Sequence, residues 1–312
     1  MKSVVMLFPG QGSQYPGMGL DYFTQHPVCR DTFLEADEAL HEKLSETIFR
    51  GAEESLTQTA NAQPAILTVS VAIGRWLMQE RGVRPVAMAG HSLGEYSALV
   101  LSQAMDFPSA IRAVRARGRF MQEAVPLGEG TMAAILGADD AVVEKVCEEI
   151  SAQGHTVEPA NYNCPGQLVI SGSNQGVALA SAECKARGAL KTVPLKVSAP
   201  FHSSMLRPAG DRLAQVLSEI RFLAPKIPYL SNVTAEEVRD ADSIAPLLAA
   251  QVWKPVKWAQ SLGRLVNQHP GVPIVECGPG KVLSGHVKKI ERDRKVYSTD
   301  PLATLDPWFL EA

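Results

Sequence analysis

The residues best suited to do chemistry lie between two glycines, in the sequence Gly-His-Ser-Leu-Gly at positions 90–94. This G-x-S-x-G pattern is typical of a nucleophile elbow, a sharp turn between a strand and a helix that exposes the serine hydroxyl for attack on a carbonyl. Glycine suits such a turn because it tolerates unusual backbone angles and adds no bulk. The apolar residues 85–89 indicate a strand before the turn, and the small residues 93–102 indicate a helix after it. The pattern favours Ser92 as a nucleophile; the alternative is an ordinary strand-to-helix turn whose serine has no catalytic role.

A serine nucleophile needs a base to accept its proton. His202 lies in an irregular stretch, residues 198–205, that precedes a predicted helix. Loops on a rigid scaffold commonly carry catalytic groups, so His202 is the candidate base; the alternative is a histidine that caps the helix. His91 is next to Ser92, but neighbours on a tight turn point apart. We therefore expect His91 to be structural or to line the pocket wall.

The nucleophile also needs donors for the oxyanion that develops during attack. The turn Pro-Gly-Gln-Gly-Ser-Gln at positions 9–14 follows an apolar strand, residues 3–8. The carboxyl ends of parallel strands are where α/β proteins bind ligands, so the backbone N–H groups near Gln11 could face the serine oxygen. The alternative, a phosphate-binding loop, lacks the G-K-[ST] sequence that a P-loop requires.

Arg117 lies on a predicted helix, residues 107–123, whose apolar residues Ile111, Val114 and Met121 face the core. A guanidinium group is a planar fork that can bind a carboxylate with two hydrogen bonds. Arg117 is therefore a candidate for binding an acidic substrate. The alternative is a solvated basic helix face, because Arg115 and Arg119 are close in sequence.

Composition limits the remaining possibilities. The chain has 312 residues, of which 46% are hydrophobic and 20% charged, and this favours a packed core of more than one domain. A net charge of −3 without a basic run excludes nucleic acid and a membrane surface as predicted partners. There is no signal peptide pattern and no apolar run long enough for a membrane span. The five cysteines are widely spaced without a C-x-x-C pair, which predicts free thiols in a reducing cytoplasm, with no metal site and no disulfides.

The elements that must position these residues follow an α/β order. Residues 128–197 read as strand, helix, two strands, helix and strand, which is the ferredoxin-like arrangement. We predict a small ferredoxin-like domain over 128–197, inserted into a large α/β-hydrolase-like domain with a parallel sheet, residues 1–127 and 198–312. The predicted helices of the large domain include residues 31–44 and 63–81. The tail, residues 298–312, is expected to lie over the surface or to be mobile.

Taken together, these motifs are similar to those of the malonyl-CoA:acyl carrier protein transacylases, the stand-alone enzymes of bacterial fatty acid synthesis, and to the related acyltransferases of polyketide synthases. The resemblance covers about residues 4–289 and rests on motifs that occur in the family's order. These motifs are residues 8–14, 63–65, 90–96, 117–118 with 121–122, 161–172, 201–203, 231–234 and 276–280.

The resemblance implies a role for each matching residue. Ser92 would be the nucleophile and His202 the base, oriented by a main-chain carbonyl in the region of Gln251 rather than by an aspartate. Backbone N–H groups of Gln11 and Leu93 would hold the oxyanion. The resemblance places five residues at the substrate: Arg117 on the malonate carboxylate, with Gln63, His91, Phe201 and Gln251.

Phe201 bears on the choice of acyl group. In the family this position is often Phe where malonate is chosen and often Ser where methylmalonate is chosen. A ring here would crowd a 2-methyl branch. The alternative is that Phe201 is a core residue with no part in specificity.

The resemblance further implies a cytoplasmic, monomeric enzyme that moves malonate from malonyl-CoA to the phosphopantetheine thiol of an acyl carrier protein, through a malonyl-serine and without a cofactor. Such a ping-pong reaction would serve fatty acid or polyketide synthesis. Three alternatives stay open: a hydrolase that removes stalled acyl groups from carrier proteins, an acyltransferase for another extender unit, and an inactive docking partner of a synthase. Arg117 argues against hydrolysis of uncharged chains, and the presence of Ser92 and His202 argues against an inactive protein.

Overall fold

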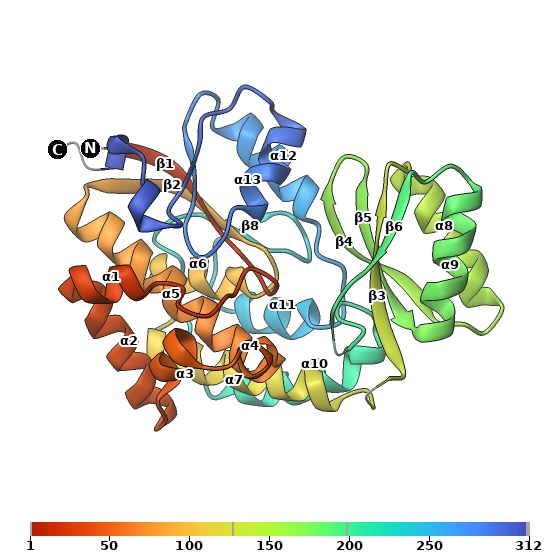
Figure 1. Cartoon of the computed structure of the whole chain (residues 1–312), viewed down its shortest axis with the longest axis horizontal. Helices are drawn as coiled ribbons and strands as arrows, with labels where there is room; N and C mark the ends of the chain where they lie inside the picture. Colours follow the sequence, from red (N-terminus) through yellow and green to blue (C-terminus); the bar gives the residue numbers. More distant parts are fainter. Residues whose placement is uncertain (1, 127, 198, 310–312) are drawn as a thin grey trace.

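The computed structural model describes residues 2–126, 128–197 and 199–309, and it contains two β-sheets (Figure 1). The larger sheet has the strand order β10-β9-β1-β2-β7-β8. Neighbouring strands are parallel except β7 and β8, which pair antiparallel at one edge. The sheet is therefore mostly parallel, as predicted, with one antiparallel edge strand. Its strands are β1 (Lys2–Phe8), β2 (Val83–Gly90), β7 (Tyr229–Leu230), β8 (Glu237–Val238), β9 (Ile274–Glu276) and β10 (Val296–Ser298).

The register of the central strands brings two loops together at one end of this sheet. Strands β1 and β2 pair so that Phe8 is the partner of Gly90, and the N–H of His91 donates to the carbonyl of Phe8 at 3.0 Å. A Cβ atom on Gly10 would lie 2.6 Å from the carbonyl oxygen of His91, so only glycine allows this approach. The loop after β1 is thus held against the turn that contains Ser92.

Helices pack on both faces of this sheet, and α5 crosses the middle of the large core (Figure 1). Two of them differ from the prediction. Helix α5 begins at Thr59 rather than near Pro64, because a full turn precedes the proline inside the helix. The helix predicted over residues 31–44 corresponds to α2, which ends at Leu40 because His41 adopts a left-handed conformation (φ 54°). A separate helix, α3, begins at Leu44.

The helices of this region have the following bounds: α1 (Leu20–Gln25), α2 (Pro27–Leu40), α3 (Leu44–Arg50), α4 (Glu53–Thr57), α5 (Thr59–Glu80), α6 (Gly94–Leu101), α7 (Phe107–Glu123), α10 (Arg207–Ser218), α11 (Ile244–Gln251), α12 (Trp258–Gln268) and α13 (Val282–Ile290).

The smaller sheet has the order β4-β5-β3-β6, with all neighbours antiparallel. Helices α8 and α9 cover it and enclose a separate apolar core (Figure 1). This confirms the predicted ferredoxin-like arrangement. The proposed junction residues Leu127 and Ser198 lie outside the described residues, so the domain boundaries stay a prediction. The elements are β3 (Gly130–Leu136), α8 (Asp140–Ala152), β4 (Val157–Cys164), β5 (Gln167–Ser173), α9 (Asn174–Ala186) and β6 (Lys191–Pro194).

Backbone hydrogen bonds join the small sheet to the segment that follows α11. The N–H of Val256 donates to the carbonyl of Ala160 at 2.8 Å, and the N–H of Tyr162 donates to the carbonyl of Val256 at 3.0 Å. Strand β4 therefore also pairs with the segment around Val256, which belongs to the part of the chain that contains the larger sheet. The chain around Gln251 and His202 lies beside this junction, since the N–H of His202 donates to the carbonyl of Val252 at 3.2 Å.

The described part of the C-terminal tail packs against the molecule. Short 3₁₀ turns occupy Leu302–Thr304 and Pro307–Phe309, and Phe309 is fully buried. The rings of Tyr297 and Trp308 stack with their centroids 4.7 Å apart. Of the two expectations for this tail, the packed one fits residues 298–309; residues 310–312 lie outside the described residues.

Two further observations concern the whole described chain. Its helices include none with the length and apolar content that a membrane span requires. All five cysteines are buried and unpaired, as the spacing predicted.

Candidate active site

Ser92 lies on a strained turn between β2 and α6. Its φ of 50° is in the left-handed region, which non-glycine residues rarely adopt. A Cβ on Gly90 would lie 1.8 Å from the carbonyl carbon of Gly94, and one on Gly94 would lie 2.2 Å from the carbonyl oxygen of Phe8. Both glycines are therefore required for the turn to close. This is the geometry of a nucleophile elbow, as the G-x-S-x-G pattern predicted.

His202 is within hydrogen-bonding distance of Ser92, with its Nε2 atom 2.9 Å from the serine Oγ. Its Nδ1 atom lies 2.8 Å from the carbonyl oxygen of Gln251 and 3.3 Å from that of Lys254. Because a carbonyl can only accept, Nδ1 carries the proton and Nε2 is free to take one from Ser92. Burial, with a further contribution from Arg117, lowers the pKa of His202 to about 3. The ring is therefore neutral at physiological pH, as a general base must be.

Arg117 projects from α7 into the same site, and its side chain is only 1% exposed. Its Nη1 donates to Gln63 Oε1 at 2.8 Å, and its Nη2 donates to Ser92 Oγ at 3.0 Å and to Gln251 Oε1 at 2.9 Å. These three partners are neutral, and no ion pair among the described residues includes Arg117. Burial lowers the pKa of this guanidinium, while Tyr96 and Glu95 raise it. A buried cation without an ion-pair partner is well suited to receive an anionic ligand.

The backbone N–H groups of Gln11 and Leu93 have no acceptor within the described chain. Both residues line the cavity that contains Ser92. Gln11 is on the loop after β1, held by a side-chain hydrogen bond from its Nε2 to Thr59 Oγ1 at 3.2 Å, and Leu93 begins the turn into α6. Two free donors that line the same cavity as the serine can together stabilise an oxyanion.

The cavity itself has a volume of about 130 Å³. Gln63 and His91 lie in its wall, and Phe201 forms an apolar part of the wall with Met121 and Met132. His91 does not contact His202; its Nε2 is 2.8 Å from Asn163 Oδ1, and burial lowers its pKa. This position agrees with the expectation that His91 lines the pocket wall.

Gln251, which the resemblance grouped with the substrate-binding residues, lies next to the cavity residues His202 and Arg117. It is fully buried and is not part of the cavity wall. Its carbonyl accepts from His202, and its side-chain amide lies behind Arg117. Gln251 thus contacts two site residues, and its carbonyl lies where the resemblance implied the group that orients His202. Its part in substrate binding stays a prediction.

Two polar residues beneath the elbow received no role from the sequence. Asn232 Oδ1 accepts from the N–H of Ser92 at 2.7 Å, and Asn232 Nδ2 donates to the carbonyl of Gly90 at 2.7 Å. Glu95 Oε2 accepts from the N–H of Asn232 at 3.0 Å and from Gln251 Nε2 at 2.7 Å. Both residues lie in recognised motifs, 90–96 and 231–234. A carboxylate in helix α6, whose other residues are uncharged and mostly apolar, was the signal that could have identified Glu95.

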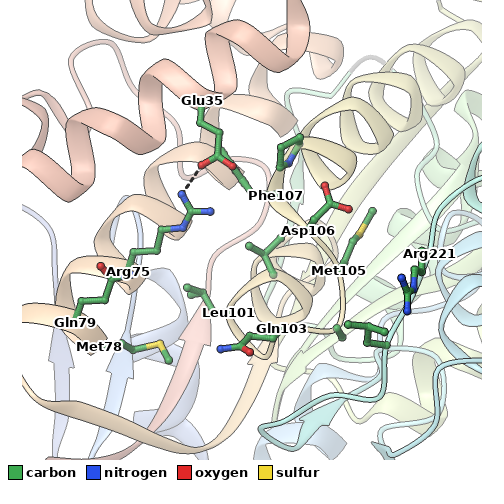
Figure 2. A pocket seen from close by; sticks show the side chains of 14 residues that line it. Glu35, Arg75, Met78, Gln79, Leu101, Gln103, Met105, Asp106, Phe107 and Arg221 are labelled. Atoms are coloured by element: carbon green, nitrogen blue, oxygen red, sulfur yellow. Dashed lines mark hydrogen bonds and ion pairs between the residues drawn. The ribbon is translucent and has the colours of Figure 1, made fainter.

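A larger groove lies elsewhere on the molecule, between α5, the end of α6 and the start of α7 (Figure 2). Its volume is about 810 Å³, but no serine, histidine or cysteine is among the described residues that line it. Of the two arginines that line it, Arg75 already pairs with Glu35 at 2.6 Å, and Arg221 is exposed to solvent (Figure 2). Nothing in this groove resembles the arrangement around Ser92.

Comparisons with known proteins agree with this arrangement. The model of the acyl transferase domain family matches residues 5–299. The malonyl CoA-acyl carrier protein transacylase of Bacillus subtilis is 46% identical over 307 residues, which cover 98% of this chain and 96% of that protein. The crystal structure of the acyl-carrier-protein S-malonyltransferase of Burkholderia pseudomallei has a TM-score of 0.94 at 42% identity and covers 100% of both chains. A type II PKS acyl-carrier protein complex with its malonyl-transacylase gives a TM-score of 0.93 at 41% identity, covering 99% of this chain and 98% of that one.

Proposed function

The chain belongs to the acyl transferase domain family, and we propose that Ser92, His202 and Arg117 carry out its transfer reaction. The protein moves a malonyl group from malonyl-CoA to the phosphopantetheine thiol of an acyl carrier protein. The observation that carries the residue assignment is the position of Arg117. This buried guanidinium has only neutral partners, and its Nη2 lies 3.0 Å from the nucleophile's oxygen.

The first half-reaction loads the enzyme. His202 Nε2 takes the proton of Ser92 as Oγ attacks the thioester carbonyl of malonyl-CoA. The N–H groups of Gln11 and Leu93 donate to the oxyanion of the tetrahedral intermediate. The intermediate then collapses, the carbon–sulfur bond breaks, and CoA leaves as a thiol with the proton from His202. A malonyl ester on Ser92 remains.

The second half-reaction repeats these steps with a different thiol. His202 takes the proton of the phosphopantetheine thiol on the carrier protein as its sulfur attacks the ester. The proton returns to Ser92 Oγ when the carbon–oxygen bond breaks. The products are malonyl-carrier protein and free enzyme, so each turnover is ping-pong.

Arg117 sets which acyl group occupies the cavity. Its fork is oriented by Gln63 and Gln251, and a malonate carboxylate bound there would be held by charge-assisted hydrogen bonds. Such a clamp fixes the acyl group beside Ser92 and excludes water, which favours transfer over hydrolysis of the ester. The ring of Phe201 in the wall narrows the space for a 2-methyl branch, a preference worth about 1–3 kcal/mol.

We further propose that the enzyme works as a cytoplasmic monomer without a cofactor. Every group in the mechanism comes from one chain, and five buried free cysteines suit a reducing compartment. The reaction serves fatty acid or polyketide synthesis, since both use malonyl-carrier protein.

A loading assay tests this proposal. The protein is mixed with malonyl-, methylmalonyl- or acetyl-CoA, quenched in acid, and examined by intact-protein mass spectrometry, and each loaded form is then offered to holo-carrier proteins. We expect a malonyl adduct that transfers to a carrier thiol. Rapid release of free acid without transfer would instead support a hydrolase, and preferred loading from methylmalonyl-CoA would support a different extender unit.

A further inference from the structure

One buried carboxylate near the site has no part in the proton transfers described above. Glu95 is on α6, one turn after Ser92, and is 1% exposed. It is not part of the cavity wall. Its Oε2 accepts from the N–H of Asn232 and from Gln251 Nε2, and its Oε1 has no hydrogen-bond partner in the described chain.

Glu95 determines which way the Gln251 amide faces. The Nε2 group of Gln251 donates to Glu95 Oε2 at 2.7 Å and to the carbonyl oxygen of Ser92 at 2.9 Å. Both of these atoms are acceptors, so the amide must present its N–H groups to them. Its Oε1 is then left to accept from Arg117 Nη2 at 2.9 Å. The orientation of the guanidinium therefore depends on Glu95 through one intervening side chain.

Glu95 is also the carboxylate that interacts electrostatically with Arg117. The groups that face Glu95 are Arg117 from α7, the phenols of Tyr96 on α6 and Tyr229 on β7, and the amides already named. Burial raises the pKa of both phenols, which keeps them neutral at physiological pH. Arg117 is thus the one cation among these groups. A substrate carboxylate on the other side of the guanidinium would compete with Glu95 for the same positive charge.

The charge on Glu95 can change near neutral pH. Burial raises the pKa of this carboxyl to about 7, against smaller opposing effects of the two N–H donors and Arg117. A substrate carboxylate bound to Arg117 would raise the pKa of Glu95 further, because the substrate's negative charge opposes the ionisation of Glu95. Binding of a carboxylated acyl group and protonation of Glu95 therefore favour each other.

We propose that Glu95 is a positioning residue that tunes selectivity for carboxylated acyl groups: its ionised form weakens the hold of Arg117 on the substrate carboxylate, and its protonated form strengthens it. This rests on the proposed function, because it requires the malonyl carboxylate to meet Arg117. The consequence is that malonyl loading, relative to acetyl loading, declines as pH rises through neutrality.

The experiment measures this preference by competition. The protein is equilibrated with equal amounts of malonyl-CoA and acetyl-CoA between about pH 6 and about pH 9, quenched in acid, and the two adducts on Ser92 are compared by intact-protein mass spectrometry. The ratio cancels the ionisation of the CoA thiol and of His202, since both reactions share them. We expect the malonyl-to-acetyl ratio of the wild type to fall by about fivefold or more across this range.

Glu95→Gln separates charge from shape. A glutamine can still accept from Asn232 and Gln251 through its Oε1, but it does not titrate. Its malonyl-to-acetyl ratio should therefore stay level with pH, close to the value of the wild type at low pH. The matched control is Glu35→Gln, which removes a carboxylate from the distant groove and should keep the slope of the wild type.

Three outcomes would overturn the proposal: a level ratio in the wild type, an unchanged slope in Glu95→Gln, or a slope lost in Glu35→Gln. The wild-type measurement decides the question even where Glu95→Gln does not fold. Failure of the proposed function looks different, because malonyl-CoA would then leave no adduct on Ser92 at any pH.

Discussion

Two hollows of this molecule contain arginines whose partners differ. Arg75 in the larger groove pairs with Glu35 at 2.6 Å, and its side chain is 25% exposed (Figure 2). Arg117 in the small cavity is 1% exposed and donates only to neutral oxygens. The groove is about six times larger, at 810 against 130 Å³, yet it lacks a nucleophile. A site is therefore identified by an unpaired buried cation beside a reactive group, and not by volume.

The energetics of the two arginines explain this difference. A partly exposed ion pair keeps much of its hydration and contributes about 0–1 kcal/mol to stability. A fully buried guanidinium has lost its hydration without gaining a direct counter-ion, which costs stability until an anion arrives. The proposed function accounts for that cost at Arg117, because the anion proposed to bind there is the carboxylate of the malonyl group.

The largest effect that tests this comparison is expected from Ser92→Ala. Loading from malonyl-CoA should fall by about 10⁴-fold or more, because the attacking oxygen is absent. Intact-protein mass spectrometry after mixing with malonyl-CoA measures the extent of loading. Gln103→Ala in the groove is the control and should load like the wild type. A fully labelled Ser92→Ala protein would remove Ser92 from the mechanism.

The next effect separates the two arginines directly. Arg117→Ala should reduce malonyl loading by about 10²- to 10³-fold, the cost of losing a buried charge pair, while acetyl loading falls much less. Arg75→Ala should change neither. Single-turnover rates with the two CoA esters provide the measurement. Equal losses on both esters in Arg117→Ala would contradict a carboxylate clamp.

A smaller effect concerns stability and pH. The carboxyl of Glu95 holds its proton more tightly when folded, with a pKa of about 7 against an ordinary value of 4.5. Its contribution to the free energy of unfolding therefore falls as pH rises from about 4.5 to about 7. Glu95→Gln removes the titrating group and so should lessen this loss of stability. The melting temperature of the variant should therefore exceed that of the wild type at about pH 8, and the difference should be small at about pH 5. A difference that is independent of pH would mean that Glu95 does not titrate in this range.

The smallest effect is expected from the exposed ion pair of the groove. Glu35→Gln should change the free energy of unfolding by less than about 1 kcal/mol, because solvent screens the pair. Denaturant unfolding of this variant measures the change. A loss of several kcal/mol would show that Arg75 depends on its partner as a buried cation would, and the contrast between the two hollows would disappear.

Much of the fold could be predicted because its signals are local. The apolar run of β1, the strand, turn and helix around Ser92, and the β-α-β-β-α-β order of the small sheet all follow from short patterns. The errors arose where local signals compete. The helix predicted over residues 63–81 begins a turn earlier, at Thr59. The helix predicted over residues 31–44 ends early because His41 adopts the left-handed conformation that glycine usually adopts after a helix.

The site was predicted only in part. The sequence identified Ser92 and His202 as candidates on chemical grounds, and the family resemblance supplied the roles of Arg117 and Gln251. Glu95 and Asn232 were missed, because a carboxylate and an amide have many surface roles, and only burial makes them exceptional. Sequence alone does not reveal that both lie beneath the elbow.

The sequence by itself determined the elements and the reactive residue types, since strand, turn and helix patterns are read over a few neighbours. Tertiary structure alone decided that Arg117 has neutral partners, that Gln251 lies behind it, and that Ser92 meets a histidine 110 positions away. The physical reason is that charge, burial and hydrogen-bonding partners depend on distances between segments remote in the chain. Those distances are set by how the two sheets and their helices pack.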